Sequence, residues 1–303
     1  MKLTQLRDIT AIAEHGSLRA AARHLGLAQP ALTRSVHDLE HELGAALFER
    51  RARGVVPTPV GAAFVARARA ILADVERARL EVEEIGGAGT GNVVVGLSVA
   101  AHLALLPRAV PRFRTRYPTA RLSLVEGFFP ALEGELKEGV MDFWVGPEPE
   151  RAPSSDLLVE RLLDNTRVVI GRAGHPLAGA TSLAELTEAE WVTTSITHRA
   201  AEELGTLFAT HGLPTPRLGM QTRSALSIFM AILCSDALGM LPVQVAEYAT
   251  GTGLLVRVPV REILPAPTIV MVRRAGLTLT PAAQWFADCC TAAAQTAIAV
   301  PKA

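Results

Sequence analysis

Cysteines and long apolar runs are scarce in this 303-residue chain, and each shortage excludes a class of protein. Cys234 and the adjacent pair Cys289 and Cys290 lack Cys-x-x-Cys or Cys/His spacing, so we expect small buried side chains in a reduced protein and no metal. The longest uncharged apolar run, near residues 225–235, is too short to span a bilayer, and no apolar segment follows Met1. These shortages predict a cytoplasmic protein without a signal peptide or a membrane partner.

Catalytic motifs are also missing. The chain has no Gly-x-Ser-x-Gly elbow, no Walker phosphate loop and no His-Glu-x-x-His helix. The glycines at 86–91 follow no predicted strand, which rejects a dinucleotide fingerprint. We therefore predict that the protein is not an enzyme and needs no cofactor. An enzyme built on a binding-protein lobe stays a minor alternative, which would require a base or nucleophile that the sequence does not offer.

Net charge is the third shortage, because 30 Lys and Arg residues balance 30 Asp and Glu residues. Residues 1–60 contain eight Lys or Arg and six Asp or Glu, an excess of two positive charges. Attraction to a polyanion would therefore depend on where the charges lie. The composition, 49% hydrophobic and 20% charged, is that of a globular protein with two or three domains.

The stretch from Ser17 to Leu43 predicts two short helices joined by a tight turn. Ser17 is a good N-cap, and Gly26 ends the first helix. In the second helix the apolar residues recur at spacings of 4, 3 and 4, which predicts one buried stripe; they are Leu32, Val36, Leu39 and Leu43. A first helix over residues 3–15 would pack behind these two.

The opposite face of the second helix then carries Gln29, Thr33, Arg34 and His37. Gln, Thr and Arg offer hydrogen bonds that match base edges, and Arg34 also reaches phosphates. This pattern predicts a helix-turn-helix whose second helix reads DNA. An ordinary amphipathic helical hairpin is the alternative for these residues alone.

Residues 45–57 follow with two short β-prone pieces around a basic tip, Arg50, Arg51 and Arg53. That composition predicts a wing whose arginines lie along phosphates or enter a narrow minor groove. A solvated basic loop is the alternative. The wing is favoured because the tip directly follows a candidate reading helix.

A long helix is predicted to begin after Thr58, with Thr58 as N-cap and Pro59 at the first helical position. Its apolar residues repeat at alternating spacings of 4 and 3, as in a coiled coil; they are Phe64, Ala68, Ile71, Val75, Ala78, Val82 and Ile85. One helix cannot bury such a seam alone, so we expect a second copy of the chain as partner. Packing against the chain's own C-terminal part is the alternative.

After a glycine-rich linker, predicted strands and helices alternate, which is typical of a parallel sheet covered by helices. Strands are expected near 93–97, 120–126, 142–145, 167–171, 191–194, 218–221, 238–241, 254–258 and 268–272. Helices are expected at 103–117, 132–138, 200–211, 226–234 and 281–297. Residues 157–170 and 265–267 would cross between two sets of elements, giving two small lobes with a cleft between them.

Ligands of open α/β sheets bind beyond the carboxyl ends of strands, close to helix N-termini. We therefore expect a small, anionic organic molecule at these ends. The candidate residues there are Ser98, Ala100, His102, Gly127, Phe128, Gly146, Thr194, Ser195, Thr197 and Thr222. Helix capping by the hydroxyl groups, with no ligand, is the alternative.

With these parts in order, the chain resembles the LysR-type transcriptional regulators of bacteria over essentially its whole length. The matching segments are residues 16–22, 29–34, 39–40, 43–44, 47–50 and 58–61. The resemblance implies that Gln29, Pro30, Thr33 and Arg34 contact bases and backbone and that Arg53 reaches the minor groove. Ser17, Arg19 and Arg51 are further candidates for DNA contact. A departure is Ala28, where most members have Ser or Thr, so the reading helix lacks a side-chain cap.

The resemblance also implies an α/β protein with an all-α winged helix-turn-helix domain, a linker helix and a two-lobed effector domain similar to periplasmic binding proteins. The expected bounds are 1–58, 59–87 and 88–303, with lobe I about 92–161 and 266–303 and lobe II about 162–265. The implied assembly is a homodimer or homotetramer on an interrupted palindromic operator, with RNA polymerase as a further partner.

The subgroup that the chain most resembles controls catabolism of aromatic acids, sulfonates and sugar acids, which suggests an aromatic or sugar carboxylate or sulfonate as inducer. The cysteines are not placed as in members that sense peroxide. The rival interpretation is an effector-independent, architectural DNA-binding protein whose C-terminal lobes only assemble oligomers.

Overall fold

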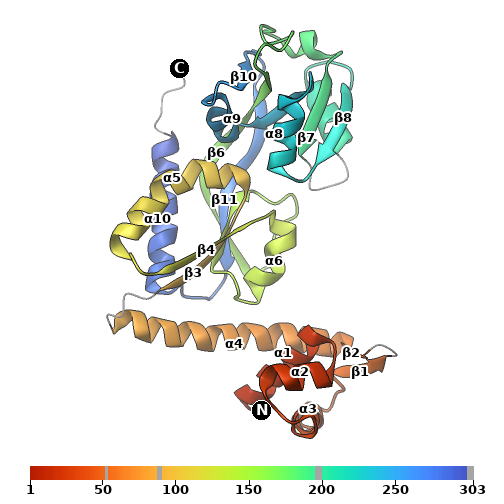
Figure 1. Ribbon diagram of the computed structural model, residues 1–303, viewed down its shortest axis with the longest axis vertical. Helices are drawn as coiled ribbons and strands as arrows, with labels where there is room; N and C mark the ends of the chain where they lie inside the picture. The colour runs from red at the N-terminus through yellow and green to blue at the C-terminus, as the bar shows by residue number, and fades with distance from the viewer. Residues whose placement is uncertain (52–53, 87–90, 195–199, 299–303) are drawn as a thin grey trace.

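The computed structural model describes residues 1–51, 54–86, 91–194 and 200–298. It is an elongated molecule with a small helical domain at one end and an α/β body at the other (Figure 1). A long helix, α4 (Pro59–Ile85), crosses beneath the body and connects the two.

The N-terminal domain packs three helices, α1 (Leu3–His15), α2 (Leu18–Leu25) and α3 (Gln29–Leu43), around a shared apolar core. The predicted caps are confirmed. The Ser17 hydroxyl accepts the Ala20 N–H at 3.4 Å, and Gly26 ends α2 in the left-handed conformation. Ala28 begins α3 without a side-chain cap.

The predicted stripe of α3 is correct for Leu32, Val36 and Leu39, which are buried. It is wrong for Leu43, which is 39% exposed. Leu43 is the last residue of α3, before Gly44, and extends beyond the three-helix core.

The wing is a two-stranded antiparallel hairpin of β1 (Phe48–Arg51) and β2 (Gly54–Pro57). The next helix, α4, begins as expected, since the Thr58 hydroxyl accepts the Gly61 N–H at 2.9 Å. Gly61 passes so close to the hairpin that an added Cβ would lie 1.8 Å from the Leu47 carbonyl oxygen. Glycine at this position therefore fixes the close contact between the wing and α4.

The apolar seam of α4 is divided between two environments. Ala68 is buried and Phe64 half-buried in the N-terminal core. The next four positions are exposed: Ile71, Val75, Ala78 and Val82. The side chain of Ile85 lies outside the described residues. Packing of the exposed positions against the chain's own C-terminal part is therefore wrong, because polar residues of α4 make that contact instead.

The first α/β set, called lobe I here, contains the parallel strands β3 (Asn92–Leu97), β4 (Arg121–Glu126) and β5 (Phe143–Pro147). Its helices are α5 (Val99–Arg116), α6 (Phe129–Lys137) and α10 (Pro281–Ile298). Two helices begin earlier than predicted. The Ser98 hydroxyl caps α5, and Pro130 occupies the first turn of α6.

The second set, called lobe II, contains the parallel strands β7 (Glu190–Thr194), β8 (Arg217–Thr222) and β9 (Leu238–Pro242). Its helices are α7 (Ala200–Thr210), α8 (Ala225–Leu233), α9 (Val243–Thr250) and a 3-10 turn η1 (Leu183–Leu186). The sequence interpretation missed α9 and η1.

Two long strands connect the lobes, β6 (Leu157–Arg172) and β11 (Leu264–Arg274), which pair antiparallel. The expected crossovers at 157–170 and 265–267 are confirmed, and both segments cross between the lobes as hydrogen-bonded strands. With β10 (Leu255–Val258) they complete one nine-stranded mixed sheet in the order β4-β3-β5-β11-β6-β9-β7-β8, where β10 pairs with β6. The expected parallel pairing is confirmed for the three strands of each lobe, while the connecting strands β6 and β11 pair antiparallel.

Candidate DNA-binding surface and effector cleft

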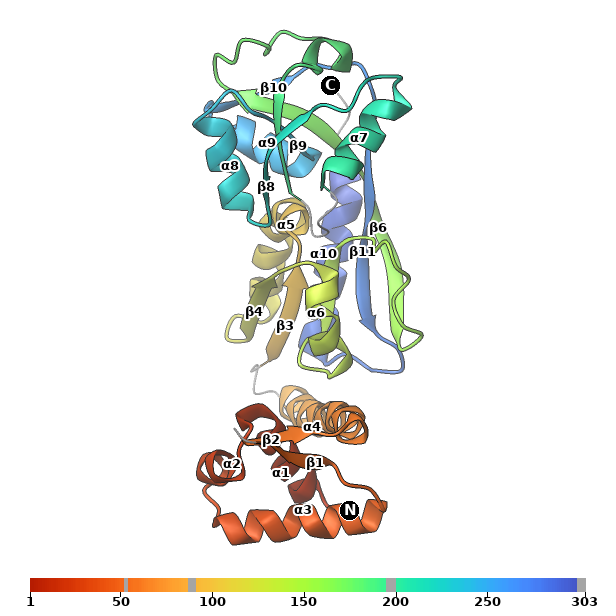
Figure 2. The same cartoon turned by 90° about the vertical axis from the view of Figure 1, so that its right-hand side faces the viewer.

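The outward face of α3 carries the polar residues that the sequence analysis selected. Gln29, Pro30, Thr33, Arg34 and His37 are all exposed and line one shallow hollow of about 560 Å³. The α3 helix lies at the end of the molecule remote from lobe II (Figure 2). The face is therefore accessible over its whole length to a partner as large as a duplex.

Polar contacts that the sequence interpretation missed fix α3 in this position. Glu40 accepts the backbone N–H groups of Leu47 at 2.7 Å and Phe48 at 3.2 Å, which ties the start of the wing to α3. Ser35 donates a hydrogen bond to the buried Asp8 carboxylate on α1. Residue spacing in the sequence could not reveal these hydrogen bonds, because each joins segments that meet only in the folded domain.

The remaining DNA-contact candidates differ in their environment. Ser17 is half-buried and occupied as the α2 cap, while Arg19 is exposed. Arg51 is exposed on the wing, where its Nε lies 3.0 Å from Glu49. Arg53 lies outside the described residues. Exposed basic side chains therefore flank the α3 face on two sides, at the start of α2 and on the wing.

The lobe I candidates gather where β3, β4 and β5 end. The Ser98 side chain is buried and accepts the Ala101 N–H at 3.2 Å, and the His102 Nδ1 lies 2.9 Å from the Ser98 carbonyl oxygen. Ala100 is buried in the core. Capping therefore occupies Ser98, which agrees with the ligand-free alternative for this hydroxyl.

Two glycines allow the backbone at this edge to pack against Trp144. An added Cβ at the buried Gly146 would lie 2.3 Å from the Trp144 ring, and the Gly127 carbonyl accepts the Trp144 Nε1–H at 3.0 Å. Phe128, half-buried, is the N-cap of α6. These candidates therefore line the carboxyl edge of the lobe I strands. Trp144, which the sequence interpretation missed, contacts both glycines there.

The lobe II candidates are only partly described. Thr222 ends β8, and its hydroxyl accepts the Ser224 N–H at 3.1 Å. Thr194 ends β7, but its side chain lies outside the described residues, as do Ser195 and Thr197. The structure therefore brings Ser98, Gly127 and Gly146 together and places Thr222 at the end of a strand in the other lobe.

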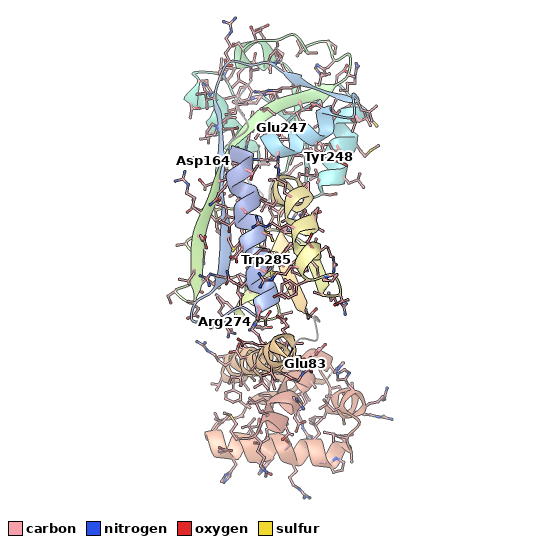
Figure 3. All side chains as sticks on the ribbon, turned by 90° about the vertical axis from the view of Figure 1, so that its left-hand side faces the viewer. Glu83, Asp164, Glu247, Tyr248, Arg274 and Trp285 are labelled. Atoms are coloured by element: carbon pink, nitrogen blue, oxygen red, sulfur yellow. The ribbon has the colours of Figure 1, made fainter. Side chains whose placement is uncertain are left out.

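A polar interface holds α4 against lobe I. Arg77, 8% exposed, donates to Asp74 at 3.2 Å, the Gly139 carbonyl at 3.2 Å and the buried Asp142 at 3.5 Å. Arg274 of β11, labelled in Figure 3, donates to Asp74 at 2.6 Å. Burial raises the pKa of Asp142, while the Val94 N–H and Arg77 lower it.

In the described part of the chain, no group of three or more His, Cys, Asp or Glu side chains can hold a metal ion. The prediction that the cysteines are buried is correct for Cys289 and Cys290 and wrong for Cys234, which is exposed just after the end of α8. Burial raises the pKa of Cys290 to about 12, so its thiol stays protonated. None of the described helices is long and apolar enough to cross a membrane.

Family models match both parts of the chain. The model described as "Bacterial regulatory helix-turn-helix protein, lysR family" matches residues 3–62, and "LysR substrate binding domain" matches residues 86–295. The chain belongs to the LysR family. It is a LysR-type, DNA-binding transcriptional regulator with a C-terminal effector-binding domain, and its relatives are regulators, not enzymes.

Among the relatives of this LysR-type regulator is the SDS degradation transcriptional activation protein of a Pseudomonas species. It is 31% identical over 291 residues, 93% of each chain. The transcriptional regulator GbpR of Azospirillum brasilense is 27% identical and covers 86% of this chain and 77% of its own.

Two solved structures confirm the fold. Full-length CbnR in complex with its target DNA has a TM-score of 0.70 and 23% identity, over 97% of this chain and 100% of that one. A full-length OxyR variant from Pseudomonas aeruginosa has a TM-score of 0.68 and 23% identity, over 97% and 95%.

Proposed function

We propose that this LysR-type regulator reads an interrupted palindromic operator with the exposed face of α3. Gln29, Thr33 and Arg34 would contact base edges, and Pro30 the backbone beside them. Their joint exposure around one hollow supports these roles. The CbnR relative was solved on its target DNA, which supports the same use of this fold here.

Residues around α3 would add sequence-independent affinity. Ser17 and Arg19 would contact phosphates beside α2, Arg51 would lie along the backbone, and Arg53 would enter the minor groove. The exposed position of Arg19 and Arg51 beside the reading helix supports this division. Together they would set the register in which α3 lies on the duplex.

The regulator would act as a dimer through α4, residues 59–87, and as a homotetramer when two dimers join. The exposed apolar positions Ile71, Val75 and Val82 support a second copy as the partner of this helix. A dimer places two α3 helices on successive major grooves, which matches a palindrome. RNA polymerase would be the further partner at a promoter.

A small organic acid would bind between lobe I (about 92–161 and 266–303) and lobe II (about 162–265). It would contact the candidate residues named above at the strand ends of the two lobes. The expected ligand is an aromatic or sugar carboxylate or sulfonate. The position of these residues at carboxyl ends of parallel strands supports the site. A ligand there acts by binding one relative orientation of the lobes more tightly than another.

Single substitutions test the assigned roles on DNA. We expect Arg34→Ala to weaken operator binding by about 1–3 kcal/mol and to reduce the preference for operator over random DNA. Arg51→Ala should weaken binding to both DNAs alike and reduce the salt dependence. Fluorescence anisotropy on both duplexes at several salt concentrations measures this. Equal loss on operator and random DNA for Arg34→Ala would contradict its reading role.

A further inference from the structure

Arg167 lies on β6 at the level where the parallel strands of lobe II end. In the sheet it stands opposite Pro242, the last residue of β9, and opposite Leu264 on its other side. Since β7 and β8 run parallel to β9, Arg167 lies at the carboxyl edge of this group of strands. Ligands of open α/β sheets bind at that edge.

The side chain of Arg167 projects toward α7. Successive residues of a strand point to opposite faces, so Arg167 shares a face with Val169. Val169 packs with Trp191 and Leu204, in the cluster that contains α7. Burial lowers the pKa of Arg167, and the carboxylate of Glu203, in the first turn of α7, offsets part of this shift.

The Arg167 guanidinium has no hydrogen bond and no ion pair with any residue that the structure describes. The two other arginines of β6 differ, since Arg161 pairs with Asp164 and Arg172 with Asp236. A half-buried cation without a partner costs free energy. Folding alone therefore does not explain why this position carries a positive charge.

Asn165 adds a second unsatisfied group to the same face of β6. It is 8% exposed, and its Oδ1 has no hydrogen-bond partner within the described chain. Two residues along a strand separate Asn165 from Arg167 by roughly 7 Å. A buried acceptor and a half-buried cation thus lie one small molecule apart, beside β11 where the strands pass between the lobes.

We propose that Arg167 binds the acid group of the effector and that Asn165 accepts a hydrogen bond from a hydroxyl group of the same molecule. The ligand class is a small hydroxy-substituted organic monoanion, a carboxylate or a sulfonate. Glu203 on α7 disfavours a second negative charge. This inference rests on the proposed effector site between the lobes, and it assigns to that site two residues which the sequence analysis did not select.

The stability of the ligand-free protein separates a binding role from a structural one. Arg167→Met keeps the length of the side chain and removes the unpaired cation, so it should leave the melting temperature unchanged or raise it. The matched control is Arg161→Met, at an exposed, paired position of the same strand, where a small effect is expected. A marked fall in the melting temperature for Arg167→Met alone would assign Arg167 to the fold and overturn the proposal.

Thermal shifts of the full-length protein then test the ligand class. The probes are 4-hydroxybenzoate, 4-hydroxybenzenesulfonate and gluconate, with 4-hydroxybenzamide as the uncharged analogue and benzoate as the analogue without the hydroxyl. We expect at least one hydroxy acid to raise the melting temperature with saturation, and the amide to be inactive. A carboxylate and a sulfonate that respond differently identify the acid group preferred.

The variants complete the test with the hydroxy acid that responds. Arg167→Met should abolish its shift, and Asn165→Ala should remove the advantage of 4-hydroxybenzoate over benzoate, or most of the gluconate shift. The proposal is overturned if no acid raises the melting temperature, if the amide acts as well as the acid, or if Arg167→Met responds like the wild type. Operator binding by the wild type without acid is measured separately, so failure of DNA binding is distinguished from failure of the acid site.

Discussion

At the residue scale, single polar side chains decide how the segments meet. Glu40 ties the wing to α3 through two backbone N–H groups, and Arg77 joins α4 to lobe I through two acceptors, the Gly139 carbonyl and Asp142. At the start of α3 such a partner is missing, because Ala28 offers no side-chain acceptor to the backbone N–H groups of the first turn. The stability of this helix therefore depends on the residue at position 28. Two predictions follow from individual side chains.

Ala28→Ser should stabilise the protein by about 1 kcal/mol. Ala28 already has the extended backbone of an N-cap, with φ −71° and ψ 132°, so a serine hydroxyl can accept a free N–H of the first turn of α3. Urea unfolding measures the gain. Ala31→Ser is the control, because a serine inside the first turn cannot cap; an equal gain for both variants would refute the capping explanation.

Glu84→Gln should gain stability relative to the wild type as the pH rises. Glu84 accepts the Ala282 N–H at 2.9 Å, and burial raises its pKa. The folded wild type therefore keeps its proton above about pH 4.3, the ordinary glutamate value, and loses stability as the carboxyl ionises. Melting temperatures from pH 4 to 7 test this. A difference between wild type and variant that stays constant with pH would contradict it.

At the element scale, α4 presents two faces with different tasks. One face carries the ion pairs with lobe I, and the other carries the exposed apolar positions Ile71, Val75 and Val82. This division explains how one helix can hold its own body and still offer a seam to a second copy. It also explains why apolar residues continue along α4 beyond the part that packs in the N-terminal core.

Arg77→Ala should destabilise the protein by about 3 kcal/mol, because it leaves the Asp142 carboxylate buried without its cation. The double variant Arg77→Ala/Asp142→Asn should recover part of the loss. Arg79→Ala, two residues along at an exposed surface position, should leave stability almost unchanged. Guanidinium unfolding of the three variants measures this. Equal losses for Arg77→Ala and Arg79→Ala would show that the buried pair contributes nothing.

The sequence predicted best those elements whose caps, stops and periodicity all lie within the element itself. Caps at Ser17 and Thr58, the glycine stops and the helical periodicities gave the N-terminal domain and α4 almost to the residue. The long strands β6 and β11 were predicted only in part, at 167–171 and 268–272, because their pairing partner lies about 100 residues away and their alternation is irregular. For the same reason Arg167 and Asn165 escaped notice, since neither belongs to a motif.

At the scale of the whole molecule, one sheet continues through both lobes. The strands that pass between the lobes are β6 and β11, and their register is irregular near Ala266 and Ile269. A change of lobe orientation would have to bend the sheet at these two strands. Lobe I in turn carries the ion pairs to α4. An effector bound between the lobes would thereby act on the same body that holds the helix of the proposed dimer.

The central claim is that paired α4 helices hold two α3 helices on one duplex, and Val75→Asp tests it most directly. Val75 is 41% exposed, so the charge should leave the single chain folded and break only the apolar seam. Ala66→Asp adds the same charge to an exposed position of α4 away from the seam.

The measurement is the affinity for an operator with two half-sites, compared with one in which a half-site is scrambled. The account predicts that the wild type and Ala66→Asp bind the two-site duplex roughly 100-fold more tightly, and that Val75→Asp loses this advantage. A Val75→Asp variant that keeps the full two-site advantage would contradict the claim.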